Sequence, residues 1–167
     1  MAAGILTRLR QRCRASVPAF PDVTAFAWIG SVIRAATPHD LPGVLELWGR
    51  TGLPPGATDD VDALARLLAT DPGALLVAER EGRVVGALIA SWDGWRGGMY
   101  RLAVAPEDRR RGVGRQLVSA GEARLRAFGA RRIAAPLDAS EPGAVAFWRA
   151  VGYVAQEGQA RFVKTVG

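Results

Sequence analysis

The segment that most constrains the fold is a glycine loop between an apolar strand and an apolar helix. It comprises the strand end Leu102–Val104, the loop Arg109–Gly114 and a helix that begins near Val113. A helix start leaves about four backbone N–H groups without internal partners, and the helix dipole adds partial positive charge there. Gly112 and Gly114 remove side chains where a ligand must approach the backbone, and arginines bind phosphate in bidentate fashion. The pattern therefore predicts an anion site suited to pyrophosphate.

Two common phosphate-binding motifs do not fit this loop. The P-loop pattern G-x-x-x-x-G-K-[ST] is absent from the sequence. A dinucleotide fingerprint requires a third glycine, and Leu117 occupies its position. The glycines alone leave a second interpretation open, a helix-capping turn with solvated arginines.

The rest of the chain predicts one α/β domain over residues 33–167. A chain of 167 residues corresponds to about one domain and can bury a real core. Thr37-Pro38-His39-Asp40 has the composition of a helix start, and Asp59 or Asp60 can cap a second helix. Ser91–Gly98 is expected to be a loop. The remaining helices are expected at Val113–Phe128 and Pro142–Val151, and the strands at Ile33–Ala36, Ala74–Ala78, Val84–Ala90, Met99–Val104, Ile133–Leu137, Tyr153–Gln156 and Ala160–Val166.

Residues 1–32 differ in composition from the rest and are expected to form a flexible basic extension. They contain four arginines and one aspartate, and thus contribute half of the net charge of +6. They lack the apolar stretch of a secretory signal or of a membrane span. A flexible tail, an over-extended start site and an organellar transit peptide all remain consistent with this composition.

The residue inventory excludes several classes of site. Cys13 and His39 are the only cysteine and the only histidine, so we expect no internal disulfide, no metal site and no Ser-His-Asp triad. The body is mildly basic and has no recognisable nucleic-acid module, so we expect no nucleic-acid partner, with binding through the basic leader as the remaining alternative. Without a membrane span, we expect a cytoplasmic monomer or homodimer.

Three ordered segments resemble the GNAT acetyltransferase superfamily. The string R-x-x-G-x-G at Arg109–Gly114 resembles the coenzyme A loop of that family, and Ile33–Leu41 resembles its first strand and helix. Ala144–Tyr153 resembles its late A-x-x-F-Y-x-x-x-G-[FY] element. The resemblance implies a mixed α/β fold, with a six- to seven-stranded sheet flanked by about four helices. The sheet would be splayed between the strands at 99–104 and 133–137.

The resemblance also implies an acyltransferase that uses acetyl-CoA. The pantetheine arm would lie in the splayed opening, and the pyrophosphate on the backbone N–H groups of residues 110–115. The thioester carbonyl would face a backbone N–H near Leu102 or Val104, which would act as an oxyanion donor. The implied cofactor-binding residues are Leu102, Ala103, Val104, Arg109, Arg110, Arg111, Gly112, Val113, Gly114 and Arg115.

Departures from the family pattern leave the catalytic residues unidentified. Trp148 stands where many members have a tyrosine that protonates the leaving thiolate, and an indole N–H is no useful acid. Glu141 replaces a frequent asparagine, and Gly97–Arg101 lacks the glutamate base of some members. The carboxylates that remain candidates, although each also fits a turn, a cap or a surface position, are Asp59, Asp60, Glu79 and Asp93.

The sequence is consistent with two functions. The first is an N-acetyltransferase, in which the amine of a small molecule or of a protein or peptide attacks the thioester directly in a ternary complex. The second, motivated by the missing acid and base, is a catalytically weak coenzyme A-binding regulator or partner-binding protein. Trp48, Trp92 and Trp95 either line an acceptor cleft or pack in the core.

Overall fold

The computed structural model describes residues 30–164. The predicted flexible leader lies outside this range except for its last three residues, and so does the end of the last predicted strand. The first strand, β1, begins at Val32. The elements in chain order are β1 (Val32–Ala35), η1 (Pro38–Asp40), α2 (Leu41–Arg50), α3 (Val61–Thr70), β2 (Leu75–Arg80), β3 (Arg83–Trp92), β4 (Gly97–Val104), η2 (Pro106–Asp108), α4 (Val113–Ala127), β5 (Ile133–Ala134) and α5 (Pro142–Ala150).

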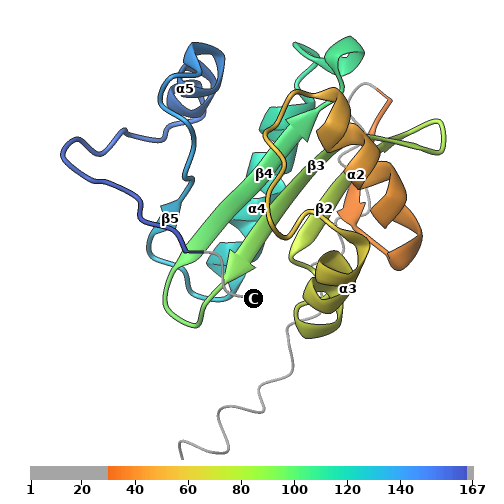
Figure 1. Cartoon of the computed structure of the whole chain (residues 1–167), viewed down its shortest axis with the longest axis horizontal. Coiled ribbons are helices and arrows are strands. Elements are labelled where there is room, and N and C mark those ends of the chain that lie inside the picture. The colour runs from red at the N-terminus through yellow and green to blue at the C-terminus, as the bar shows by residue number, and fades with distance from the viewer. Residues whose placement is uncertain (1–29, 165–167) are drawn as a thin grey trace, which may run out of the picture.

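The strands form one mixed sheet in the order β1-β2-β3-β4-β5. The first four strands pair antiparallel with their neighbours in sequence, and β5 pairs parallel with β4. In Figure 1, α2 and α3 lie in front of the sheet and α4 lies behind it. The predicted mixed α/β fold with a sheet flanked by helices is therefore confirmed.

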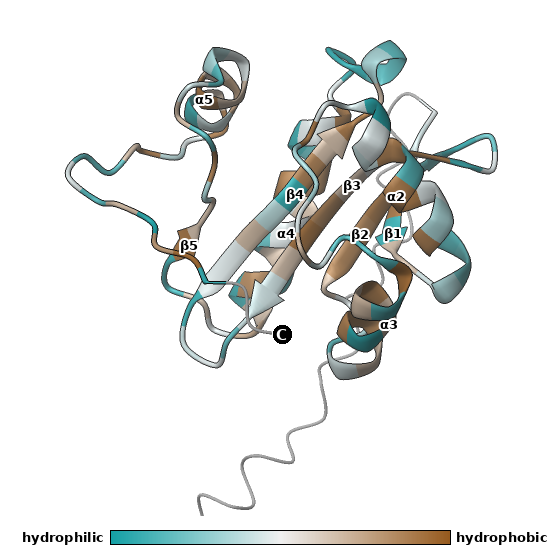
Figure 2. Cartoon of the chain, in the orientation of Figure 1, coloured by the Kyte–Doolittle hydropathy of each residue, from teal (hydrophilic) through white to brown (hydrophobic). Residues whose placement is uncertain are grey.

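The core lies on both faces of β2 and β3. Leu75, Leu76, Val77 and Ala78 are all fully buried, as expected for a strand covered on both sides. Figure 2 shows these two strands as predominantly hydrophobic, whereas hydrophobic and hydrophilic residues alternate along the helices in front of them. The continuous apolar runs in the sequence thus mark the centre of the sheet.

The start of η1 lies where the sequence predicts a helix start, and Thr37 and Asp40 hold it together. The Asp40 carboxylate accepts hydrogen bonds from the backbone N–H of Thr37 at 2.7 Å and from its hydroxyl at 2.8 Å. Arg34 of β1 donates to both oxygens of this carboxylate, each at 2.7 Å. The hydrogen bonds from Arg34 hold the pKa of Asp40 well below its ordinary value.

We expect Asp40→Asn to lower the free energy of unfolding by about 2 kcal/mol at neutral pH, because charge-assisted hydrogen bonds are lost. Since the folded pKa is depressed, this stabilisation is fully present above the ordinary aspartate pKa of about 4, declines as the pH falls below that value, and is lost as the pH falls through the folded pKa. Urea titrations of both proteins at about pH 7 and pH 3 test this. A difference between the two proteins that is equally large at both values would contradict the role of the charge.

The sheet of the described residues has five strands, fewer than the six to seven predicted. The strand predicted at Ile133–Leu137 ends at Ala134, because Pro136 has no N–H to continue a ladder. The strands predicted at Tyr153–Gln156 and Ala160–Val166 are absent up to Lys164, although Gly158 between them adopts the positive φ of a turn. Beyond Tyr153, their apolar side chains are exposed and have no layer to pack against, as Val154, Phe162 and Val163 show.

The predicted loop Ser91–Gly98 is shorter in the structure. The strand β3 continues to Trp92 and β4 begins at Gly97, so the connection is the tight turn at residues 93–96. Asp93 forms this turn by accepting hydrogen bonds from the backbone N–H groups of Trp95 at 2.7 Å and Arg96 at 2.6 Å. Local turn chemistry therefore extends both strands beyond the range that the glycine and tryptophan content predicted.

Candidate active site

The glycine loop forms an uncapped helix start. Gly112 is the N-cap of α4 and has a φ of 83°, in the left-handed region that favours glycine. The first helical bond runs from the N–H of Gln116 to the carbonyl of Gly112 at 3.0 Å. The N–H groups of Val113, Gly114 and Arg115 thus precede the helical ladder, and the N-cap has no side chain to bind them. These donors are available to an anion.

The loop meets the late segment of the chain at Gly114. A Cβ atom built on Gly114 would lie 3.2 Å from the ring of Phe147 and 3.6 Å from the side chain of Val104. Phe147 of α5 therefore rests on the first turn of α4, beside the end of β4. The glycine loop, the end of β4 and α5 are thus adjacent in space.

The acidic residues next to the loop are directed away from it. Glu107 pairs with Arg50 of α2 at 2.8 Å, and the buried Asp108 pairs with Arg80 of β2. Among residues 30–164, no ion pair involves the loop arginines at 109, 110, 111 and 115, all of which are exposed. The positive charge of the loop is therefore not neutralised by its acidic neighbours.

The edge of β4 opens beside this loop. The parallel pairing to β5 joins only Gly97 to Ile133 and Gly98 to Ala134, after which the chain leads away toward α5 (Figure 1). Within the described range, Leu102–Val104 thus have no strand partner on this side. The Val104 carbonyl accepts a hydrogen bond of 3.2 Å from Nε of Arg109. The structure therefore places all ten predicted cofactor residues along one open edge and one helix start.

A bulge in β4 reverses the direction of its side chains. The pairing with β3 shifts by one residue between Ile89–Tyr100 and Ala87–Ala103, and Arg101 within the shift has a φ of 55°. On one side of the bulge Met99 lies beside Gly121 of α4, and on the other Val104 lies beside Gly114 of α4. Met99 and Val104 thus face the same helix, although residues an odd number apart point to opposite faces of a regular strand.

The bulge turns Arg101 to the opposite face, toward α2 and the segment that follows it. Its guanidinium carbon lies 4.8 Å from the ring centre of Trp48, and its Nη1 donates to the Pro54 carbonyl at 2.9 Å. Its Nη2 pairs with Asp59. Sequence patterns did not reveal this residue, because a bulge centred on a residue other than glycine leaves no signal in the spacing of apolar positions.

The four candidate carboxylates all have structural partners. Asp60 caps α3 by accepting from the Ala63 N–H at 2.7 Å, and Asp59 accepts from the Gly56 N–H at 2.6 Å as well as pairing with Arg101. Glu79 pairs with Arg34 at 2.7 Å. The turn hydrogen bonds from Arg96 and Trp95 lower the pKa of Asp93, which makes it a weaker base. The general base therefore stays unassigned.

Trp148 is buried and is packed between two aromatic rings. Its ring centre lies 5.7 Å from that of Phe147 and 4.7 Å from that of Tyr153, both in edge-on arrangements. The Tyr153 hydroxyl donates to Sδ of Met99 at 3.4 Å. Burial raises the pKa of Tyr153, so the hydroxyl keeps its proton at neutral pH. The position that often holds the family's tyrosine acid thus holds a packing residue.

The other tryptophans do not gather into one wall. Trp48 is 3% exposed and belongs to the core. Trp92 stacks on Phe128 at 6.3 Å between ring centres, and the exposed Trp95 is covered by Arg96 at 3.8 Å. Of the two alternatives that the sequence left open, packing applies to Trp48 and Trp92.

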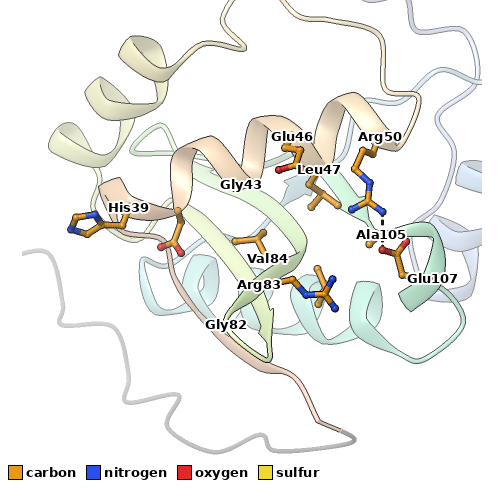
Figure 3. A pocket seen from close by; sticks show the side chains of 12 residues that line it. His39, Gly43, Glu46, Leu47, Arg50, Gly82, Arg83, Val84, Ala105 and Glu107 are labelled. Carbon is orange, nitrogen blue, oxygen red and sulfur yellow. Dashed lines mark hydrogen bonds and ion pairs between the residues drawn. The ribbon is translucent and has the colours of Figure 1, made fainter.

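A cavity of about 330 Å³ lies between α2, the turn from β2 to β3, and the segment after β4 (Figure 3). Its charged side chains include Glu46, Arg83 and the ion pair between Arg50 and Glu107. No predicted cofactor-binding residue lines it. This cavity is therefore separate from the open edge of β4.

Residues 30–164 lack two further features. No group of three or more histidine, cysteine, aspartate or glutamate side chains there is arranged to hold a metal ion. No helix in the same range is long and apolar enough to cross a membrane.

Similarity to known proteins shows the class of this protein, which is that of the acyltransferases. The family model described as Acetyltransferase (GNAT) family matches residues 41–153. The chain therefore belongs to the GNAT acetyltransferase family, and the resemblance seen in the sequence is confirmed. Among curated proteins, the acetyltransferase plu1384 of Photorhabdus laumondii is 41% identical over 102 residues, which cover 60% of this chain and 71% of that protein.

Experimental structures share the fold at low sequence identity. Ard1 from Thermoplasma volcanium superposes with a TM-score of 0.69 at 21% identity, covering 77% of this chain and 85% of Ard1. The protein AAC(6')-Iy, in complex with the bisubstrate analog CoA-S-monomethyl-acetylneamine, has a TM-score of 0.66 at 21% identity. That match covers 81% of this chain and 99% of AAC(6')-Iy. These likenesses establish the fold alone.

Proposed function

We propose that this protein is an N-acetyltransferase that moves an acetyl group from acetyl-CoA to an amine of a small molecule or of a protein or peptide. The observation that carries the proposal is the uncapped start of α4, with its unneutralised arginines, at the open edge of β4. GNAT enzymes use acetyl-CoA, and this arrangement fits the anionic and the amide-bearing parts of that molecule.

Each part of acetyl-CoA has a proposed position. The pyrophosphate binds to the N–H groups at the start of α4 and to the loop arginines, and the pantetheine amides pair with Leu102–Val104. The Val104 carbonyl already accepts a hydrogen bond from Arg109, so Arg109 must turn toward the phosphates before a pantetheine N–H can replace it. The thioester carbonyl faces a backbone N–H near Leu102 or Val104, which stabilises the negative charge that develops on oxygen.

The transfer is a direct attack within a ternary complex. The amine nitrogen bonds to the thioester carbon, the carbon–sulfur bond breaks, and the sulfur leaves with both electrons of that bond. The nitrogen gives up one proton, which solvent accepts. A thiol pKa near 8.5 makes departure as thiolate at pH 7 costly by only about 2 kcal/mol, so solvent can protonate it later. Deprotonating an α-amine costs about 1 kcal/mol at pH 7, against about 4.6 kcal/mol for a lysine amine. With every candidate base already paired, we expect weakly basic acceptors.

A catalytically weak coenzyme A-binding regulator is the second candidate. Two observations favour it, namely the packing role of Trp148 and the structural partners of all four candidate carboxylates. It shares the binding site with the first candidate and differs in turnover.

Two measurements on the purified full chain test these functions. Acetyl-CoA at 100 times its Kd should add about 2.7 kcal/mol to the free energy of unfolding and so raise Tm. Thiol release across a panel of amines then separates the candidates, because an enzyme releases thiol only when the right amine is present. Binding without turnover on any amine supports the regulator. The absence of a Tm shift with both acetyl-CoA and coenzyme A would reject both candidates.

A further inference from the structure

Arg101 combines several costly features at one position of β4. Its backbone has a positive φ, and its Nε is buried without a hydrogen-bond partner. The indole N–H of Trp48, on the ring beneath the guanidinium, is also buried without a partner, although the Trp48 side chain is 97% buried and polar groups in such places are normally satisfied. Costs of this kind cluster where a protein binds a ligand or performs chemistry.

The contacts of the Arg101 guanidinium indicate which kind of group would complete its hydrogen bonds. Nη1 binds the Pro54 carbonyl, and Asp59 reaches Nη2 while Nε remains unused. Carboxylates prefer to bind arginine through two adjacent nitrogens at once. The Nε–Nη2 edge is therefore only half occupied, and the group that already touches it is a carboxylate.

The position of Arg101 relates it to the acceptor and not to the coenzyme. The next residue, Leu102, begins the stretch proposed to hold the thioester, whereas the loop arginines lie at the start of α4. The bulge directs Arg101 to the face covered by α2, opposite to α4. An amine that reaches the open edge of β4 from the α2 side therefore comes close to Arg101 and to its partners Pro54 and Asp59.

We propose that the acceptor is an amine that also carries a carboxylate, of the amino-acid or peptide type, and that Arg101 binds this carboxylate through Nε and Nη2. The ligand carboxylate replaces that of Asp59, and the Trp48 N–H provides a second donor beside it. Asp59 lies in residues 51–60, which contain no helix or strand, so its side chain can withdraw without unwinding an element. The proposal rests on the proposed function and specifies its substrate class.

Kinetics with matched acceptors test the selectivity. Each pair contains the same amine with either a carboxylate or a carboxamide, and kcat/KM is measured for both with the native chain and with Arg101→Gln. We expect Arg101→Gln to reduce the preference for the carboxylate by about tenfold or more, the loss typical of one charged hydrogen-bonding pair. Because paired acceptors also differ in amine pKa, the decisive quantity is the change of the ratio on mutation. An unchanged ratio would overturn the proposal.

Asp59→Asn changes the other member of the Arg101–Asp59 pair and should have the opposite effect on the carboxylate acceptors. It removes the internal competitor but leaves Arg101 in place, so KM for the carboxylate acceptors should fall several-fold while KM for the carboxamides stays constant. A purely structural ion pair predicts instead that both variants lose stability and that neither alters the preference. This variant also keeps the test decisive if Arg101→Gln does not fold.

A binding measurement distinguishes failure of this proposal from failure of the proposed function. In protein labelled with ¹⁵N, the Trp48 indole resonance is identified by its loss in Trp48→Phe. Titration with N-acetylglycine should shift this resonance, whereas N-acetylglycinamide should not, and Arg101→Gln should abolish the shift. Equal responses to both compounds, or none, would reject the carboxylate site. A selective shift in a protein that acetylates no amine would reject the transferase and retain the site.

Discussion

Gly112→Glu is expected to abolish acetyl-CoA binding at concentrations that saturate the native chain. The new carboxylate would stand at the start of α4, where the pyrophosphate is proposed to bind. Two like charges about 4 Å apart at a protein surface repel by about 4 kcal/mol, which corresponds to a loss of affinity of about a thousandfold. Isothermal titration with acetyl-CoA measures the effect directly.

Gly112→Gln is the matched control, because it adds the same length and the same backbone strain without the charge. A Cβ atom at this position has room, since the nearest atom is Nε2 of Gln116 at 3.9 Å, so strain comes from the positive φ alone. That strain is worth about 1–2 kcal/mol, and affinity should fall far less than with glutamate. Equal losses in both variants would assign the effect to strain, and full affinity in Gly112→Glu would reject the proposed phosphate position.

Asp71→Ala is expected to cause a large loss of stability, about 3 kcal/mol, because it leaves a buried charge without its partner. The Arg124 side chain is 4% exposed on α4, pairs with Asp71 and donates to the Ala90 carbonyl at 2.7 Å. Burial lowers the pKa of Arg124, which shows that its surroundings oppose the charge and that Asp71 compensates. Urea unfolding at neutral pH, followed by circular dichroism, gives the free energy difference.

Arg124→Met and the double variant complete this test. The Asp71 side chain is 22% exposed, so it regains water when Arg124 is removed, and Arg124→Met should cost less than Asp71→Ala. Since a methionine fills much of the buried space, the double variant should be more stable than Asp71→Ala alone. A double variant whose loss equals the sum of the two single losses would show that the pair contributes no coupling.

Features that depend on neighbours in the chain were predictable from the sequence. The helix start at Thr37–Asp40 and the Asp60 cap each use a side chain within a few residues, and the structure contains both. The loop before α4 also depends on a nearby residue, because Gly112 adopts the positive φ that precedes the helix. In these places composition determines backbone geometry directly.

Features that depend on distant residues were not predictable. Arg101 and Asp59 are 42 residues apart, and no spacing rule indicates that they pair or that the pairing occupies a candidate base. The short β5 follows from Pro136, which the sequence shows. The sequence does not show that the later segments at 153–164 have no layer to pack against. The predicted strands at 153–166 had suitable local composition, and the described part of the sheet does not include them.

The strand order also has a consequence for how the chain assembles. The strands from β1 to β4 lie in the sheet as they follow in the sequence, and the turns β2–β3 and β3–β4 are tight hairpins. Contacts between residues close in sequence form rapidly, because little chain entropy is lost in closing short loops. The strand β5 must wait until α4 has crossed the sheet, and only two residue pairs then attach it to β4. The side of the proposed coenzyme site that β5 and α5 contribute is thus expected to form last in folding and to open first in unfolding.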